Sequence, residues 1–197
     1  MKDRTCKTIY KALTIVIAVI LLFFAGIFVY RFIEKKYMYP LAYKEEVSLC
    51  AQEFNVPNTL IYSIIKVESG FIKSAKSEKG AIGLMQLTPD TAKYIANLLN
   101  EKEYDLYNEK VNIRFGTFYI KYLLDRFENP STAIVAYNAG EGNVRGWLKN
   151  KEYSLDGKTL ENIPFNESKN YLEKIKETFA KYQNLYGNIL DKQKIFS

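Results

Sequence analysis

The sequence predicts an all-α protein in which a helical domain follows a single N-terminal transmembrane helix. Apolar residues recur at helical spacing between positions 44 and 186, without a convincing strand pattern. Residues 12–30, ALTIVIAVILLFFAGIFVY, form an uncharged run about as long as a helix needs to cross the hydrocarbon core of a membrane. A chain of 197 residues has room for one domain and such an appendage.

The part of the chain before this domain divides by charge and hydropathy into three segments. Residues 1–11 are short and basic, residues 12–33 are the expected membrane anchor, and residues 34–42 are a juxtamembrane connector. The apolar run is longer than the usual core of a signal peptide, and no clear cleavage site follows it, so we favour an uncleaved anchor over a signal peptide. Positive charges flank both ends, and the positive-inside rule therefore orients the anchor only weakly.

Residues 43–186 are expected to form the domain, and residues 187–197 a basic tail. Asn55-Val56-Pro57 breaks the first helix, Thr88-Pro89 supplies a hydroxyl cap followed by proline, and Gly140 is a natural C-cap. From these signals and the apolar spacing we expect helices at residues 44–54, 57–68, 88–99, 108–127, 132–138, 144–149 and 167–186.

Composition excludes several kinds of site. The chain has no histidine, so His-dependent nucleophilic triads and His-containing zinc sites cannot be built from it. Cys6 and Cys50 lie on either side of the apolar run without metal-site spacing, so we expect unpaired thiols and neither a metal nor a cofactor. The net charge of +6 is spread along the helices, which indicates no nucleic-acid partner and suits work against anionic envelope polymers.

One carboxyl group, that of Glu68, lies where a general acid is expected. The helix that starts near Pro57 has a buried stripe, and Glu68 is in its last turn. The negative end of the helix dipole and the apolar neighbours both disfavour ionisation there, so the group keeps its proton near neutral pH. Most single glutamates at helix ends are simply solvated, and spacing alone does not overturn that interpretation.

A glycine-containing loop at residues 70–83 follows this acid. It has no strand pattern and is expected to be an ordered loop that crosses the site of Glu68. Gly80 and Gly83 suit positions that need a positive φ or a close approach of the backbone. Gly116, in the helix at residues 108–127, is expected to mark a close crossing of two helices.

Four motifs resemble, in their order along the chain, the catalytic core of lytic transglycosylases of the soluble-lytic-transglycosylase (SLT) type, which are similar in fold to goose-type lysozyme. They cover residues 43–186, so the resemblance implies a lysozyme-like helical domain. The motifs are ESGF at 68–71 with Ser77, GAIGLMQ at 80–86 with Thr88-Pro89, AYNAG at 136–140 with Gly142 and Val144, and IPF at 163–165 followed by Glu167-Ser168 and Asn170-Tyr171.

The resemblance also implies roles for single residues. Glu68 matches the catalytic acid, and the substrate-binding residues are Ser77, Met85, Gln86, Tyr137, Asn138 and Tyr171. From the residues alone, Met85 reads as core, Asn138 as a helix cap and Tyr171 as a core tyrosine, and these alternatives stay open. Lys169 stands where the family commonly has an arginine, which removes a bidentate fork.

Enzymes of this family cleave the β-1,4 bond between N-acetylmuramic acid and N-acetylglucosamine without water. The C6 hydroxyl of muramic acid attacks its own C1 and leaves a 1,6-anhydro end. By resemblance, Glu68 first protonates the glycosidic oxygen and then acts as base toward that hydroxyl, so one carboxyl group suffices where most glycosidases use two. The substrate's N-acetyl group and polar atoms of Tyr137 or Ser77 would stabilise the positive charge.

Two other functions compete with this interpretation. A hydrolytic lysozyme of the same fold would need a base to activate water, for which Glu78, Asp90 and Glu141 are loose candidates. A glycan-binding module without turnover would not need Glu68. The preferred partners are peptidoglycan glycan strands and the bacterial cell membrane, with the catalytic domain on the extracytoplasmic side; the sequence does not indicate an oligomeric state.

Overall fold

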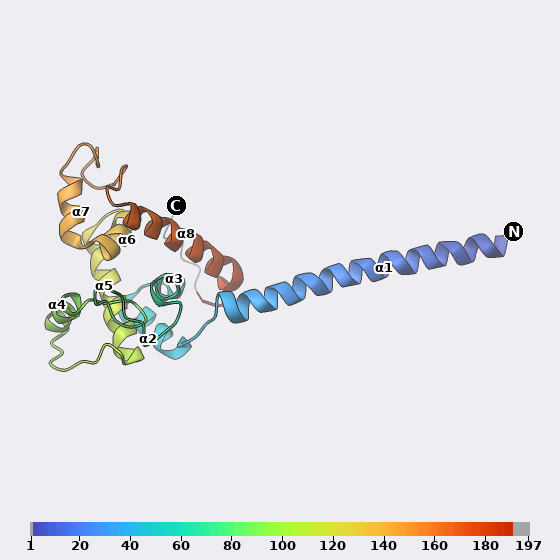
Figure 1. The fold of residues 1–197 in the computed structure, drawn as a ribbon, viewed down its shortest axis with the longest axis horizontal. Coiled ribbons are helices and arrows are strands. Elements are labelled where there is room, and N and C mark those ends of the chain that lie inside the picture. Colours follow the sequence, from blue (N-terminus) through green and yellow to red (C-terminus); the bar gives the residue numbers. More distant parts are fainter. Residues whose placement is uncertain (1, 191–197) are drawn as a thin grey trace. The chain divides into compact units, whose positions relative to one another are not determined.

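The computed structural model describes residues 2–190 and confirms the all-α prediction (Figure 1). In that range the chain forms helices and loops without a β-strand, and isolated β-bridges join Lys76 to Ile82 and Ile82 to Leu87. The chain divides after Pro40 into two compact units. The end of the predicted tail, from residue 191 on, lies outside the described residues.

The first unit is a long apolar helix. Helix α1 spans Lys2–Ile33 and continues into a π-helical turn, η1, at Glu34–Met38. By length and composition, the segment Leu13–Met38 could cross a membrane. A signal sequence near an N-terminus passes the same test, so the predicted anchor stays a prediction.

The second unit contains the seven predicted helices. Helix α3 contacts α2 and α8, helix α5 contacts α2, α4 and α6, and α6 also contacts α7 and α8. The described helices of this unit are α2 (Lys44–Phe54), α3 (Asn58–Ser69), α4 (Pro89–Leu99), α5 (Glu109–Arg126), α6 (Pro130–Ala139), α7 (Glu141–Leu148) and α8 (Asn166–Tyr186).

Side-chain caps fix where several of these helices begin. The Thr88 hydroxyl accepts a hydrogen bond from the Thr91 amide at 3.2 Å at the start of α4, as its position before Pro89 predicts. Asn108 and Asn129 cap α5 and α6 in the same way through their carboxamide oxygens. Gly140, at φ 87°, ends α6 and directly precedes α7.

Helix α3 is held in the core along most of its length. Leu60, Ile61, Ile64 and Ile65 have no exposed surface, and each such side chain contributes roughly 1.5–3 kcal/mol through burial. The packing of α3 against α2 and α8 therefore fixes the position of its C-terminal turn. Nearby, Cys50 is a buried free thiol whose pKa burial raises to about 12, so it is unreactive.

The long loop between α3 and α4 is attached to α5 by one buried asparagine. Asn112 donates hydrogen bonds to the carbonyls of Ile82 and Leu106, both at 2.9 Å, and its Oδ1 accepts one from the Met85 amide at 2.8 Å. Both hydrogens of the carboxamide and its oxygen are thus used at a site with about 1% exposure. Together with the β-bridges within the loop, this side chain fixes the path of the loop.

Two glycines allow the close packing of this loop. Gly83 has a φ of 80°, and a Cβ there would lie 2.2 Å from Asn112 Nδ2. Both reasons predicted for a glycine at this position, a positive φ and a close approach of the backbone, therefore apply. A Cβ at Gly116 would lie 2.3 Å from Met85 Sδ. The prediction that Gly116 marks a helix crossing is therefore wrong, because the group that approaches it is a side chain of the loop.

Candidate active site

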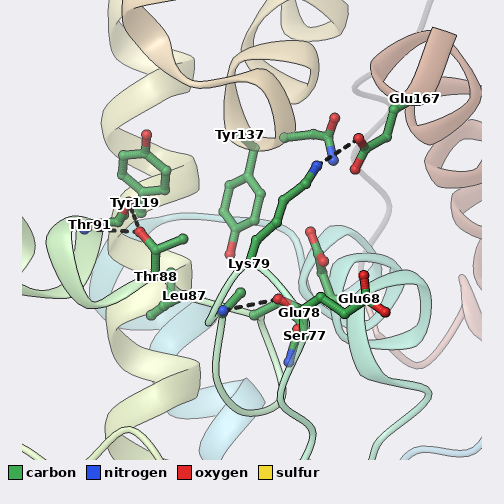
Figure 2. Close-up of a pocket in the computed structure, with 13 residues that line it drawn as sticks. Glu68, Ser77, Glu78, Lys79, Leu87, Thr88, Thr91, Tyr119, Tyr137 and Glu167 are labelled. Carbon is green, nitrogen blue, oxygen red and sulfur yellow. Dashed lines mark hydrogen bonds and ion pairs between the residues drawn. The ribbon is translucent and has the colours of Figure 1, made fainter. Parts of the chain in front are cut away.

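A cavity of about 370 Å³ opens beside the C-terminal end of α3 (Figure 2). Its walls come from α3, the following loop, α4, α5, α6 and the first turn of α8, so segments from across the domain meet there. The described residues that line it are Glu68, Ser77, Glu78, Lys79, Ala81, Gln86, Leu87, Thr88, Thr91, Tyr119, Tyr137, Asn138 and Glu167.

Glu68 occupies the cavity wall at the next-to-last position of α3. The neighbouring Ser69 fixes this helix end, because its hydroxyl contacts the Ile65 carbonyl at 3.1 Å and the Leu84 carbonyl at 2.8 Å. Burial raises the pKa of the Glu68 carboxyl group from 4.5 to about 7, and the charge of Glu167 adds to this increase. A proton is therefore available on Glu68 near neutral pH.

Two tyrosines approach this carboxyl group. The Tyr137 hydroxyl donates a hydrogen bond to the Met85 carbonyl at 2.9 Å, and burial, with a smaller contribution from the charge of Glu68, raises the pKa of Tyr137. The buried Tyr171 hydroxyl faces Glu68 and lowers its pKa, although the pair lies outside regular hydrogen-bond geometry and that hydroxyl has no other partner among the described residues. Tyr137 lines the cavity, whereas Tyr171, expected from the motifs to bind substrate, is buried and is not among the lining residues.

Ser77 and Gln86 line the cavity from the loop. Ser77 Oγ accepts a hydrogen bond from the Ala81 amide at 3.0 Å, which leaves its own hydrogen for a ligand. Gln86 Nε2 donates to the carbonyls of Ala75 at 3.2 Å and Gly83 at 2.9 Å. These bonds give both side chains a fixed position in the wall.

Asn138 and Met85 differ in their positions. Asn138 lines the cavity, and its Oδ1 accepts a hydrogen bond from the Ser168 hydroxyl at 2.7 Å, which connects α6 to α8. The Met85 side chain has no exposed surface and is not among the lining residues. The expectation that Met85 forms the cleft wall is corrected: its side chain packs in the core, and its carbonyl instead positions Tyr137.

Several lining residues were not identified as site residues from the sequence. Tyr119 is a cavity residue whose ring lies 5.4 Å from that of Tyr137, and burial raises its pKa to about 12. On a helix with many apolar positions nothing distinguished it from core residues. Lys79 was also missed, and it forms an ion pair with Glu167 at 2.8 Å (Figure 2). No local signal predicts a contact between residues so far apart along the chain.

Comparison with known proteins identifies the domain. The sequence profile of the Transglycosylase SLT domain matches residues 47–160, more than half of the chain. The chain belongs to the SLT transglycosylase family. This confirms the resemblance to the family. The SLT match spans Glu68, the loop and α6, and so contains the first three motifs, whereas the fourth, at residues 163–171, lies beyond it.

Relatives within the SLT family are similar over most of this chain. It is 32% identical to the soluble lytic murein transglycosylase of Salmonella typhimurium over 155 residues, covering 76% of this chain and 24% of the relative. It is 30% identical to the membrane-bound lytic murein transglycosylase C of Actinobacillus pleuropneumoniae over 162 residues, covering 68% and 44%. The chain thus spans only about a quarter of the length of the soluble relatives.

Solved structures of SLT proteins share the fold. The 70 kDa soluble lytic transglycosylase of Escherichia coli superposes with a TM-score of 0.68 at 29% identity, covering 81% of this chain and 26% of that one. An inactive variant of the lytic transglycosylase Slt of Pseudomonas aeruginosa, with a glutamate replaced by glutamine, gives 0.65 at 30% identity, covering 74% and 24%. These similarities confirm the lysozyme-like SLT fold.

Proposed function

We propose that this chain is a lytic transglycosylase of peptidoglycan. It cleaves the β-1,4 bond between N-acetylmuramic acid and N-acetylglucosamine without water and leaves 1,6-anhydromuramic acid ends. The observation that carries the proposal is the Glu68 carboxyl group, which burial holds at a pKa of about 7 in the wall of a cavity within an SLT domain.

Glu68 acts as the acid in the first step. Its protonated carboxyl group donates the proton to the glycosidic oxygen, so the N-acetylglucosamine leaves as an alcohol. Positive charge then develops at C1 of muramic acid. Two hydroxyl groups of the cavity can position the sugar ring. The Ser77 hydroxyl can donate to a substrate oxygen, and the Tyr137 hydroxyl lies near Glu68.

The same carboxylate acts as base in the second step. Having lost its proton, Glu68 accepts one from the C6 hydroxyl as that oxygen attacks C1, and the carboxyl group returns to its starting state. Burial favours this return, because it disfavours the ionised form. One group with a pKa near the working pH can thus complete both transfers.

The cavity favours this scheme over hydrolysis. Of the loose candidates for a water-activating base, Asp90 and Glu141 are not among the lining residues, and Glu141 is paired with Arg145 at 2.7 Å. Glu78 lines the cavity but is exposed, without the buried surroundings of Glu68. Glu78 is therefore the group on which a hydrolytic lysozyme reaction would depend.

The relatives support this assignment. Those from Salmonella typhimurium and Escherichia coli are soluble lytic murein transglycosylases, and murein is peptidoglycan. In the Pseudomonas aeruginosa enzyme, a change of one glutamate to glutamine gives an inactive variant. An essential carboxyl group in that relative is consistent with the role proposed for Glu68.

We also propose that α1 anchors the enzyme in the cell membrane as a single span, with the catalytic domain on the extracytoplasmic side. The apolar segment is long enough, and one relative from Actinobacillus pleuropneumoniae is membrane-bound. Peptidoglycan lies outside that membrane, so an enzyme that cuts it must face outward.

Digestion of purified peptidoglycan tests the function. Mass spectrometry of the released fragments should find 1,6-anhydromuramic acid ends, which lack one water relative to reducing ends. Reducing ends would establish a hydrolytic lysozyme instead. No release by a folded protein that still binds glycan would establish a binding module.

A further inference from the structure

We propose that Lys79 determines specificity by binding a carboxylate of the substrate, on the muramic acid next to the bond that is cut. This inference rests on the proposed function, because it concerns the muramic acid of peptidoglycan. Muramic acid differs from glucosamine by a lactyl ether that ends in a carboxyl group. That group is free, or it is joined to a stem peptide that carries carboxylates of its own.

The charges of the cavity wall lead to this assignment. The described lining residues include three carboxyl groups, on Glu68, Glu78 and Glu167, and one basic side chain, that of Lys79. The carboxylates of Glu78 and Glu167 therefore repel a substrate carboxylate, and repulsion in solvent reaches several ångströms at physiological salt. Next to Lys79 it meets a positive charge instead.

Lys79 is also in the right place. It follows Ser77 in a turn closed by hydrogen bonds from Gly80 and Ala81, and its side chain extends from the loop to Glu167 in the first turn of α8 (Figure 2). Lys79 and Glu68 line the same cavity, and the ion-pair partner of Lys79, Glu167, is close enough to Glu68 for its charge to add to the effect of burial on the pKa of that group. A sugar bound against Glu68 can therefore bring a carboxylate to the Lys79 ammonium group.

The ion pair with Glu167 can exchange for one with the substrate. Lys79 Nζ lies 2.8 Å from Glu167 Oε2, but the two side chains are 77% and 66% exposed. Exposed pairs of this kind are weak and open readily. Glu167 therefore holds the ammonium group in position in the free enzyme and releases it when a substrate carboxylate arrives.

Binding measurements in the Glu68→Gln background test this without turnover. The ligands are glycan strands stripped of stem peptides, glycan strands that keep their stems, and a neutral N-acetylglucosamine hexamer. Lys79→Met should weaken calorimetric binding of the carboxylate-bearing strands about threefold to fivefold and leave the hexamer unchanged. Lys79→Arg should restore most of the loss, and the strand type that responds identifies the lactyl or the stem carboxylate as the source.

Lys73→Met is the matched control, because Lys73 is an exposed lysine of the same loop that pairs with Glu109 and does not line the cavity. Glu167→Gln should strengthen binding of the carboxylate-bearing strands by removing the competing partner. Equal losses for the hexamer, no loss with Lys79→Met, or weakening with Glu167→Gln would overturn the inference. An inactive wild-type enzyme would contradict the proposed function. The affinities of the variants for the three ligands would still decide whether Lys79 binds a carboxylate.

Discussion

At the scale of single residues, the proposed chemistry depends on how Glu68 keeps its proton. The carboxyl group is at a helix end whose neighbours are in the core, and burial is the largest cause of its raised pKa. The buried residues of α3 end at Ile65, one turn before Glu68, so packing of the helix in the core places this carboxyl group at the edge of the core.

Glu68→Gln should reduce the release of anhydromuropeptides about ten-thousandfold or more, at the upper end of what general acid–base catalysis contributes. The amide keeps the shape of the side chain but cannot deliver a proton. Product release from purified peptidoglycan, followed by mass spectrometry, measures the effect. Glu78→Gln, which alters an exposed carboxyl group of the same cavity, is the control and should keep most of the activity; the reverse result would make Glu78 the acid.

The same substitution should also change how stability depends on pH. Because the folded-state pKa of Glu68 is about 7 and the ordinary value is 4.5, the folded protein loses stability as the pH rises from about 4.5 to about 7 and the buried group ionises. Glu68→Gln avoids this loss. At pH 8 the variant should be more stable than the wild type by about 3 kcal/mol, with no such gain at pH 4, as urea unfolding at both values would show. A constant difference at both values would contradict the pKa.

At the scale of elements, the loop between α3 and α4 owes its path to side chains outside it. Gly83→Ala should destabilise the domain by about 3 kcal/mol or more, because the new methyl group meets Asn112 in a well-packed interior and the φ is positive. Gly80→Ala is the matched control: it has a similar φ of 81° but no atom within 4 Å, so it should cost about 1 kcal/mol. Thermal unfolding of both variants compares the two costs, and equal losses would show that backbone strain alone matters.

The helices were predictable because their signals are local. Thr88-Pro89 and Gly140 act on the backbone next to them, and apolar spacing reports each buried face directly. The path of the loop between α3 and α4 could not be predicted in this way. Asn112 donates hydrogen bonds to carbonyls 6 and 30 residues away, and in the sequence it is only one polar residue in a helix. Glu68, Ser77, Gln86, Tyr137 and Asn138 were placed at the cavity through motif resemblance, whereas the side-chain position of Met85 depended on its packing against Gly116.

At the scale of the whole molecule, the division after Pro40 separates the proposed membrane anchor from the domain that contains the candidate active site. A chain that begins at Leu41 should fold with an unchanged unfolding temperature and cleave glycan strands in solution at the full rate, because the cavity is built entirely from the second unit. The full chain should float with lipid vesicles, and the shortened chain should not. Flotation of both would contradict the anchor, and release from cells of a protein that begins after Ala25 would show that the apolar run is a signal peptide.

The turn that bears Glu78 and Lys79 has a consequence for evolution. Its base is held by Asn112 and Gly83, whereas the exposed side chains of Glu78 and Lys79 line the cavity, and Lys79 pairs with the Glu167 side chain. Substitutions at such positions change folding stability very little. Substitutions at this turn can therefore change the charge of the cavity that contains Glu68 with little effect on folding, so the proposed preference for charged substrates can evolve independently of the fold.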